Sequence, residues 1–423
     1  MGGEVNGMRA LVLMAAAVFM VAGCGSLTPI ATGGYKLYAA ASMSTLMQVA
    51  VIDSNSHAIE RKLQLGTPSN DWKHLYSVIS SSLIDTNPEN GATLRTLQLP
   101  RHYELPKATI SGVPGGMSQN GRWLALQAFD RSGSTTTATH LLLVDTSFGS
   151  NPVPIDLKGW FEFDAISNDG QNLFLIQYVA PQQYHVRLYH VAQHDLDPNF
   201  VVEKGASQTS TMAGIKLMSV ASRDGEWLYT LYARENEGAF IHGLQLNGGP
   251  FAACIDLPGE GYSKDPDQFR WSLAINPNGQ VLYAANGAMG AVSEIAIGGN
   301  AWPTVRTTSK IGGGASAHSS LVSSVQAKES SSNVAIVTPD GKTLIAAGAT
   351  GIVFLDTNGL ATRNRALDGW HIRSIGLTPD GRTLYAFNDG GEIAEVAVGS
   401  AKVGAKFDPS AGNPIALMRV AAP

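Results

Sequence analysis

The chain has 423 residues, of which 44% are hydrophobic and 15% are charged, and its formal net charge is −5. This length and hydrophobic content suffice for a large core, either in one repeat domain or in two or three independent domains. A mildly acidic chain without a basic run lacks the electrostatic footprint of a nucleic-acid-binding protein, so no nucleic-acid partner is expected.

The first residues have the pattern of a lipoprotein signal peptide. Arg9 precedes an apolar run over residues 11–22, which is too short to span a bilayer. The run ends in Val-Ala-Gly-Cys, and this ending resembles a bacterial lipobox with Cys24 as the lipidated residue. An ordinary secretory signal or a membrane anchor that happens to contain a cysteine is the alternative.

Residues 1–23 are therefore predicted to be the signal peptide, and residues 24–34 to be the lipidated Cys24 followed by a Gly/Thr/Pro tether. The lipid on Cys24 would anchor the protein to the bacterial cell membrane without a transmembrane helix. The predicted location is exported, on the periplasmic or extracellular face.

The remaining chain, residues 35–423, reads as a series of short strands. The early strand-like runs, each bounded by Gly, Asn, Pro or Ser, are residues 36–39, 49–53, 61–65, 75–79, 83–86 and 94–99. After residue 105 the pattern becomes regular. The strands that precede each turn end near Met117, Ile166, Ala221, Ile275, Val337 and Leu377, and a last strand covers residues 414–420.

One turn motif recurs between these strands. Its clearest copy is Thr378-Pro379-Asp380-Gly381, and related Asp-Gly or Asn-Gly turns place glycines at positions 121, 170, 225, 279, 341 and 381. Such dipeptides between apolar runs are a strong hairpin signal, because glycine accepts the positive φ of a tight turn. A period of roughly 40–55 residues with about four strands per repeat is typical of β-propeller blades.

The expected fold is therefore an all-β, seven-bladed β-propeller. A propeller ring has to close so that no strand edge is left unpaired, and we expect the C-terminal strand to pair with N-terminal strands. Eight blades is the alternative, because the N-terminal part holds more strands than one blade needs. The stretch from Thr67 to Trp72 is a candidate for a degenerate copy of the turn.

The Thr/Ser-Pro-Asp-Gly-x-x-Leu-Tyr pattern, followed later by Phe354-Leu355-Asp356-Thr357, resembles the YVTN and PD40 repeats of bacterial β-propellers. That superfamily includes lactonase-like and TolB-like proteins. The resemblance covers about residues 35–423. It implies the propeller fold but no particular activity, because these proteins share turns rather than a catalytic signature.

Motifs for chemistry are absent from the sequence. It contains no G-x-S-x-G, H-E-x-x-H, Cys-x-x-Cys, P-loop or Rossmann motif, so no catalytic residue and no cofactor is predicted. In a strand, His185 and His190 would face opposite sides, and only His190 and His194 could converge. No metal site is predicted.

Candidate binding residues follow from the geometry of a propeller, whose inner strands converge on a central channel. Positions about eight residues before each turn glycine, with their neighbours, collect charged, amide, imidazole and indole side chains from different blades. Polar groups that converge beside an aromatic are the usual signature of a ligand site. The candidates are Glu162, Asp164, Lys216, Arg270, Trp271, Asn333, His371 and Arg373. The alternative is that these charges pair between blades.

The tryptophans divide into two groups. Trp123 and Trp227 follow a turn glycine by two residues and are expected to pack between blades, whereas Trp160, Trp271 and Trp370 precede inner strands and are candidates for ligand stacking. Two functions follow. The first is a non-catalytic lipoprotein of the cell envelope whose propeller binds a protein or glycan partner. The second is a lactonase-like hydrolase in which Glu162 or Asp164 acts with His371 as general acid and base.

Overall fold

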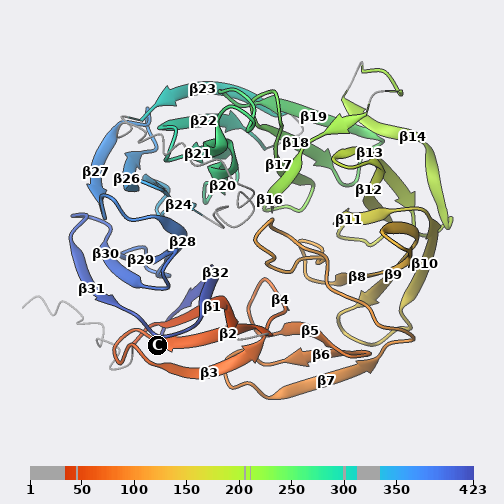
Figure 1. Cartoon of the computed structure of the whole chain (residues 1–423), viewed down its shortest axis with the longest axis horizontal. Coiled ribbons are helices and arrows are strands. Elements are labelled where there is room, and N and C mark those ends of the chain that lie inside the picture. Colours follow the sequence, from red (N-terminus) through yellow and green to blue (C-terminus); the bar gives the residue numbers. More distant parts are fainter. Residues whose placement is uncertain (1–33, 44–45, 204–205, 210, 299–301, 312–333) are drawn as a thin grey trace, which may run out of the picture.

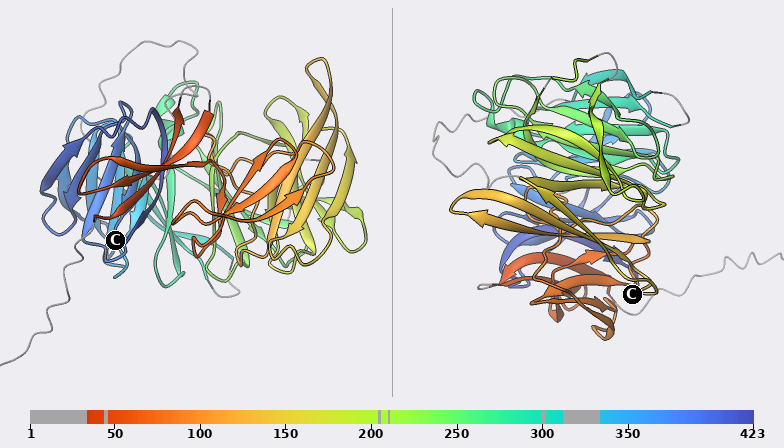
Figure 2. Two further views of the ribbon diagram at one scale, coloured as in Figure 1. Left: turned by 90° about the horizontal axis from the view of Figure 1, so that it is seen from below. Right: turned by 90° about the vertical axis from the view of Figure 1, so that its right-hand side faces the viewer.

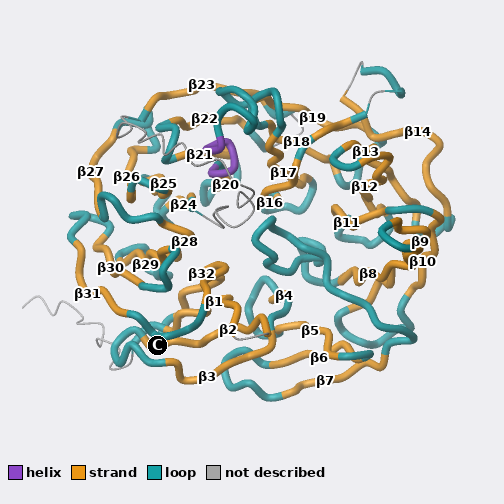
Figure 3. Tube along the Cα trace, viewed as in Figure 1, coloured by secondary structure: helices purple, strands orange, loops and turns teal. Residues whose placement is uncertain are grey.

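The computed structural model describes residues 34–43, 46–203, 206–209, 211–298, 302–311 and 334–423. Cys24, the signal peptide, the tether up to residue 33, and Asn333 lie outside these residues. The described chain consists almost entirely of strands and connecting loops, and its one helical segment is the short 3-10 helix η1 (Pro266–Arg270) (Figure 3). None of the helical structure in the described ranges has the length and hydropathy to cross a bilayer.

The strands form antiparallel meanders arranged around a ring (Figure 1). The N-terminal third of the chain contributes β1 (Lys36–Met43), β2 (Leu46–Asp53), β3 (Ile59–Gln64), β4 (Thr67–Pro68), β5 (Leu75–Ile79), β6 (Ser82–Thr86), β7 (Thr93–Gln98), β8 (Trp123–Ser132), β9 (Thr135–Asp145) and β10 (Val153–Lys158). The middle part contributes β11 (Phe161–Ile166), β12 (Asn172–Ala180), β13 (Gln183–His190), β14 (Asp195–Glu203), β15 (Met212–Ala213), β16 (Ile215–Ala221), β17 (Trp227–Ala233), β18 (Phe240–Gln245) and β19 (Phe251–Asp256).

The C-terminal part completes the ring with β20 (Ser272–Ile275), β21 (Val281–Asn286), β22 (Ala291–Ala296), β23 (Thr304–Lys310), β24 (Ala335–Val337), β25 (Thr343–Gly348), β26 (Gly351–Asp356), β27 (Thr362–Ala366), β28 (Ile372–Leu377), β29 (Thr383–Asn388), β30 (Ile393–Ala397), β31 (Val403–Phe407) and β32 (Asn413–Ala421). In each meander the first strand lies nearest the centre and the last lies at the rim (Figure 1). The architecture is a β-propeller.

The described strands belong to seven hydrogen-bonded sheets, and the largest of these contains two meanders, β11–β14 and β16–β19. Their outer strands β14 and β19 pair in parallel at Val202–Phe251 and Glu203–Ala252. Counted by meanders, the described chain therefore gives eight units, which agrees with the eight-blade alternative rather than with the seven blades that the turn glycines suggested.

The unit that the glycine count missed is β4–β7. Its turn follows the same plan as the others, but Trp72 occupies the position of the turn glycine with a φ of 58°. Trp72 N donates to Ser69 O at 2.9 Å, as Gly381 N donates to Thr378 O at 2.8 Å. The stretch from Thr67 to Trp72 is thus a degenerate copy of the turn, hidden in the sequence because glycine is replaced.

The turn motif is held by side chains as well as by backbone. The turn at Gly279 opens with Asn276, whereas the other turns open with a Ser or Thr. The hydroxyl of that Ser or Thr donates to the carboxylate or amide oxygen two residues on, as in Thr378 Oγ1 to Asp380 Oδ1 at 2.6 Å. The same hydroxyl accepts from the backbone five residues on, as in Thr383 N at 3.0 Å. These local bonds satisfy polar groups that the strands leave unpaired, which explains why the motif repeats.

The ring closes as expected. β32 is the inner strand of the meander β32-β1-β2-β3 and pairs antiparallel with β1, for example at Leu37–Val420. The inner strands β11, β16, β20, β24 and β28 also end at the residues predicted from the turns, whereas Met117 forms only a single bridge with Leu124.

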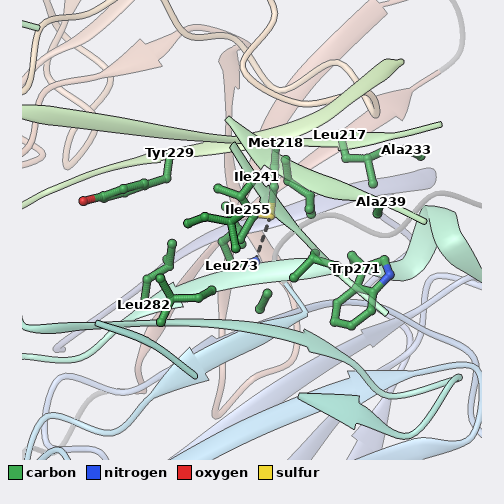
Figure 4. Packing of buried hydrophobic residues seen from close by; sticks show 14 of the residues in the cluster. Leu217, Met218, Tyr229, Ala233, Ala239, Ile241, Ile255, Trp271, Leu273 and Leu282 are labelled. Carbon is green, nitrogen blue, oxygen red and sulfur yellow. Dashed lines mark hydrogen bonds between the residues drawn. The ribbon is translucent and has the colours of Figure 1, made fainter. Parts of the chain in front are cut away.

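The hydrophobic core is divided among the interfaces between neighbouring units. At the interface of β16–β19 with β20–β23, Leu217, Leu231, Ile241 and Leu282 are at most 3% exposed and belong to the same core cluster as Trp271. Figure 4 shows part of this cluster. Leu273 N and Met218 Sδ lie 3.3 Å apart across this interface. Because each unit contributes one apolar face to each neighbour, the ring is stabilised as a whole.

Seen from the side, the units form a ring of similar height, and the longest hairpin, β8–β9, projects from one face (Figure 2). Trp123, at the start of β8, packs under the turn of the next unit, since a Cβ added at Gly170 would lie 2.4 Å from its ring. Trp227 is 5% exposed within the core cluster of Figure 4. The predicted packing role of both residues is confirmed.

Candidate functional site

The inner strands carry β-bulges at the positions where side chains meet the channel. The register of β11 with β12 shifts between Phe163 and Ala165, and the register of β28 with β29 shifts between Ile372 and Ser374. Asp164 and Arg373 are therefore left out of the ladder. A bulge re-aims the side chain of the extra residue, and bulges are enriched next to functional sites.

Asp164 is the most deeply buried charge among the predicted candidates. Its side chain is 0% exposed, and its Oδ1 accepts from Lys216 Nζ of the neighbouring unit at 3.0 Å. Its second oxygen, Oδ2, is buried without a hydrogen-bond partner among the described residues. A buried carboxylate oxygen without a donor is costly, so this atom marks a place where a further donor would be stabilising.

A segment that the sequence analysis did not anticipate enters the channel. Where the unit β8–β10 lacks a regular inner strand, residues 106–115 form a short hairpin, here called the channel hairpin, with Lys107 opposite Pro114. Its tip reaches the β16 strand, where Ile110 N donates to Leu217 O at 2.9 Å. Its base is held by Thr67, whose Oγ1 donates to Gly115 O at 2.7 Å.

A cavity of about 260 Å³ lies between the channel hairpin and the inner strands of its neighbours. Asp164 and Lys216 contribute charge from the strands, and Lys107 contributes a second ammonium group from the hairpin. The rest of its lining is mixed, with apolar residues such as Met117 and Ile166 and polar residues such as Asn70 and Gln119. The structure therefore brings together two of the predicted residues, Asp164 and Lys216, in one concave site.

Arg270 and Trp271 do not join this site. Arg270 is in η1, where its Nε donates to Asp267 Oδ1 at 3.1 Å. Trp271 is 1% exposed, belongs to the core cluster of Figure 4, and donates from Nε1 to Gln268 Oε1 at 3.2 Å. The prediction that Trp271 stacks on a ligand is wrong, because the residue before β20 turns its ring into the interface between two units.

His371 and Arg373 lie across the ring from the cavity. Arg373 Nε donates to Asp389 Oδ1 at 2.9 Å, and His371 Nδ1 lies 4.0 Å from Asp389 Oδ2. The strands β28 and β11 occupy opposite sides of the ring (Figure 1). His371 is thus not a neighbour of Glu162 or Asp164, contrary to the acid–base pairing considered from the sequence.

Glu162 lies beside two stacked aromatic rings at the start of β11. The three residues Trp160, Tyr178 and Glu162 are here called the aromatic step. The Trp160 ring stacks on the Tyr178 ring with centroids 4.2 Å apart, and Tyr178 OH donates to Glu162 Oε2 at 3.2 Å. Burial and the nearby Glu162 charge raise the pKa of Tyr178, so it remains a donor at neutral pH. Trp160 is 36% exposed, which leaves part of its apolar ring accessible near the Glu162 carboxylate.

Trp370, the third predicted stacking residue, is half-buried and covered. Lys406 Nζ lies 4.5 Å from its ring centroid, in a cation–π contact. Of the three tryptophans, Trp160 alone combines an exposed ring with a position at the start of an inner strand.

The histidine-rich stretch is engaged in ordinary contacts. His190 Nε2 lies 3.2 Å from Asp197 Oδ2, and the His185 ring stacks on Phe200 with centroids 3.9 Å apart. Within the described ranges, no three His, Cys, Asp or Glu side chains gather in a way that could hold a metal ion.

Behind Asp164, a group of polar side chains is buried between the same two units. The Tyr184 and Tyr232 rings lie 5.6 Å apart, and the Tyr232 and His242 rings lie 6.4 Å apart. Burial lowers the pKa of His242 to about 4, although the charge of Asp164 acts in the opposite direction. His242 is therefore neutral at physiological pH.

Comparisons with known proteins agree with the fold. No family model matches the sequence, and no curated protein matches it either. Apo AztD from Citrobacter koseri has a similar structure, with a TM-score of 0.50 and 10% identity over 92% of this chain and 97% of that one. The periplasmic gluconolactonase PpgL from Pseudomonas aeruginosa aligns with a TM-score of 0.43 and 16% identity over 90% of this chain and 97% of that one.

A putative 6-phosphogluconolactonase from Bacteroides uniformis aligns with a TM-score of 0.40 and 15% identity over 83% of this chain and 96% of that one. At these identities the likeness to AztD concerns the fold alone.

Sequence reasoning missed Lys107 and Tyr178. Lys107 lies in a segment that has no repeat signature, and Tyr178 lies near the far end of β12, six residues after the strand begins at Asn172. The alternation of β12 gives no signal for Tyr178, because its role depends on the ring of Trp160 that it supports.

Proposed function

We propose that this protein is a non-catalytic cell-envelope lipoprotein, anchored through Cys24, whose propeller binds a protein or glycan partner. The aromatic step carries the proposal. Trp160 has an exposed ring that stacks on the Tyr178 ring. Glu162 is held beside them by the hydrogen bond that it accepts from the Tyr178 hydroxyl. Tyr and Trp are enriched where partners bind, because a large rigid ring buries much surface at a small entropic cost.

The chemistry of the step suits either class of partner. An apolar sugar face or an aromatic side chain would cover Trp160, while a hydroxyl or amide N–H would donate to the Glu162 carboxylate. The Tyr178 hydroxyl holds Glu162 in place before binding, so less rotamer entropy is lost when the partner arrives.

A lactonase-like hydrolase remains the alternative, and no contact within the described residues favours it. Catalysis by a general acid and a general base requires both groups within hydrogen-bond reach of the substrate. Glu162 is engaged by Tyr178, whereas His371 lies on the opposite side of the ring beside Asp389.

The first experiment compares the purified full chain with Trp160→Ala in a glycan array and in capture of proteins from envelope extracts. Trp302→Ala is the matched control, because Trp302 is 38% exposed and lies next to β23 at the rim. Partner capture that is lost in Trp160→Ala and retained in Trp302→Ala supports the proposal. Turnover of a panel of lactones by the full chain, with no partner captured, contradicts it.

The second experiment tests the anchor. We expect the full chain expressed in a bacterium to fractionate with membranes and to incorporate labelled palmitate, and Cys24→Ser to lose both properties. Membrane association of Cys24→Ser equal to that of the parent chain would contradict the lipid anchor.

A further inference from the structure

A pocket of about 560 Å³, here called the His74 pocket, lies where the unit β4–β7 meets the neighbouring unit β8–β10 (Figure 1). This volume falls within the range of roughly 300–1,000 Å³ that is common for small-molecule sites. Both units contribute to its lining, so the ring as a whole shapes the pocket.

The fully buried carboxylate of Asp85 holds two basic side chains together at the wall of this pocket. His74 Nδ1 lies 2.9 Å from Asp85 Oδ1 and 3.0 Å from Oδ2, and Arg95 donates to Oδ2 from Nε at 2.9 Å and from Nη2 at 2.5 Å. The Asp85 side chain is 0% exposed, whereas those of His74 and Arg95 are 32% and 33% exposed and line the pocket. The two basic side chains therefore lie beside each other and are accessible from the pocket.

The histidine distinguishes this unit from the rest of the repeat. Asp85 lies opposite a tyrosine of the neighbouring strand, and the unit β20–β23 repeats this arrangement with Glu294, which accepts from Arg306 Nη1 at 3.2 Å. The position of His74, five residues after the residue that opens the turn, holds Val281 in that unit. A pair of an acid and an arginine therefore occurs elsewhere in the scaffold, whereas the imidazole is added in β4–β7.

The hydrogen bonds of the two basic side chains determine what they can still bind. A carboxylate only accepts, so His74 Nδ1 donates to Asp85, and Nε2 donates to a ligand when the imidazole carries a second proton. Among the described residues, the hydrogen bonds of Arg95 use three of its five N–H groups, two on Asp85 and one on Ser147 O at 2.7 Å. The remaining donors of Arg95 and protonated His74 can together bind one oxyanion group.

The charge of the pocket fits a ligand with a single negative charge. Protonated His74 and Arg95 carry two positive charges, and Asp85 offsets one of them. Asp71 also lines the pocket, but its charge is offset by Lys73, whose Nζ lies 3.5 Å from Asp71 Oδ2. One positive charge is left, which a carboxylate neutralises and a phosphate dianion would exceed.

The rest of the lining is uncharged and largely polar. It includes Tyr76, whose pKa is raised by burial, so that its hydroxyl stays neutral. The other side chains carry hydroxyl or amide groups and are Ser69, Asn70, Asn120, Thr146 and Ser147. Such groups pair with hydroxyl groups of a ligand, so the body that carries the carboxylate is polyhydroxylated rather than apolar.

We propose that the His74 pocket binds a sugar that carries one carboxylate, which is the chemistry of a uronic acid. The carboxylate accepts from Arg95 and from Nε2 of protonated His74, and the hydroxyl groups of the sugar bond to the uncharged lining. This inference does not depend on partner binding by the aromatic step, whose residues do not line the pocket.

The test is isothermal titration of the purified full chain with D-glucuronate, D-glucuronamide and acetate at about pH 6 and about pH 8. D-Glucuronamide has a similar shape without the charge, and acetate has the carboxylate without the hydroxylated body. At the lower pH we expect saturable binding of D-glucuronate and at least about tenfold weaker binding of each of the other two compounds. At the higher pH, where histidine side chains are normally neutral, D-glucuronate should bind at least about fivefold more weakly.

Two variants and one control assign the contacts. At the lower pH, His74→Gln should bind D-glucuronate at least about fivefold more weakly than the parent chain, with no difference between the two pH values, because an amide does not titrate. Arg95→Gln should also weaken D-glucuronate but keep the pH dependence. In His74→Gln the buried Asp85 charge stays paired with Arg95, so this variant remains informative if Arg95→Gln fails to fold. Arg306→Gln is the matched control, because it removes an arginine that is paired with an acidic residue in a unit without the histidine.

Binding of D-glucuronate that is weakened in both pocket variants and unchanged in Arg306→Gln supports the proposal. Four results overturn it: no saturable binding of D-glucuronate at the lower pH, equal affinity for D-glucuronate and D-glucuronamide, equal affinity for D-glucuronate and acetate, or the same pH dependence in His74→Gln as in the parent chain.

Discussion

Asp164 of β11 and Lys216 of β16 form an ion pair that joins two neighbouring units of the ring, with Oδ1 and Nζ 3.0 Å apart. The carboxylate side is fully buried, and 22% of the lysine side chain is exposed. The pair therefore joins two neighbouring units, and both of its residues also line the cavity beside the channel hairpin.

Removing the lysine alone should be strongly destabilising. Lys216→Met leaves the Asp164 carboxylate buried without its cation, and breaking a buried pair from one side costs about 3–5 kcal/mol. Urea unfolding of the full chain measures this loss. The double variant Asp164→Asn with Lys216→Met should be more stable than Lys216→Met, because no charge remains buried. If the double variant is as unstable as Lys216→Met or less stable, the unpaired Asp164 charge is not the cause of the destabilisation in Lys216→Met.

The second prediction concerns the stability of alanine variants at two turn glycines. Gly381 has a φ of 72°, and a Cβ there would lie 2.7 Å from Pro339 Cδ in the turn of the preceding unit. Gly359 has a φ of 90° with no atom within 4 Å of its Cβ position. Both alanine variants carry the strain of positive φ, which costs about 1–3 kcal/mol.

Gly381→Ala should therefore be the less stable of the two by about 1 kcal/mol or more, because it adds a contact between turns. Thermal unfolding of both variants beside the parent chain measures the difference. If Gly359→Ala is as destabilising as Gly381→Ala, the contact between neighbouring turns contributes nothing measurable to the ring.

The third prediction concerns the loss of folding stability in acid, which the buried His242 should cause. Its pKa is lowered to about 4 by burial, whereas an unfolded histidine titrates near about 6.5. Between these values the unfolded chain binds more protons, so stability is retained above pH 6.5 and falls as the pH is lowered towards 4. One histidine with this shift contributes a loss of about 3 kcal/mol over that window.

Replacing His242 by Phe removes this titration and should flatten the dependence of stability on pH between about 6.5 and 4. The measurement is urea unfolding at several pH values. His102→Phe is a control, because the His102 ring is exposed and its Nδ1 contacts Ser80 O, far from the buried group around His242. An acid slope that is the same in His242→Phe and in the parent chain would contradict the role of His242.

Much of the ring could be predicted from the sequence because its turns are local structures. The Thr378 hydroxyl and the Asp380 carboxylate accept from backbone N–H groups within five residues, and most other turns repeat these bonds, so the motif carries its own geometry. The ends of five inner strands follow from it. The unit β4–β7 was missed when turn glycines were counted, because its turn keeps the same hydrogen bonds but has Trp72 in place of the glycine.

The candidate site could be predicted only in part, because it depends on contacts between units. Asp164 and Lys216 were found from their distance to the turns, and they do meet. Trp271 was misplaced because the sequence cannot show which way a residue beside η1 turns its ring. The channel hairpin was missed because nothing in its local pattern encodes its contact with Leu217.

Trp160 is the residue through which the proposed envelope partner would bind. The decisive measurement is the affinity of the captured partner for the full chain, for Trp160→Ala and for Trp302→Ala, made by surface plasmon resonance on one preparation. We predict at least a tenfold loss in Trp160→Ala, since truncating an aromatic that dominates an interface costs about 2 kcal/mol or more, and no change in Trp302→Ala. Equal affinities of Trp160→Ala and the parent chain would contradict the central claim.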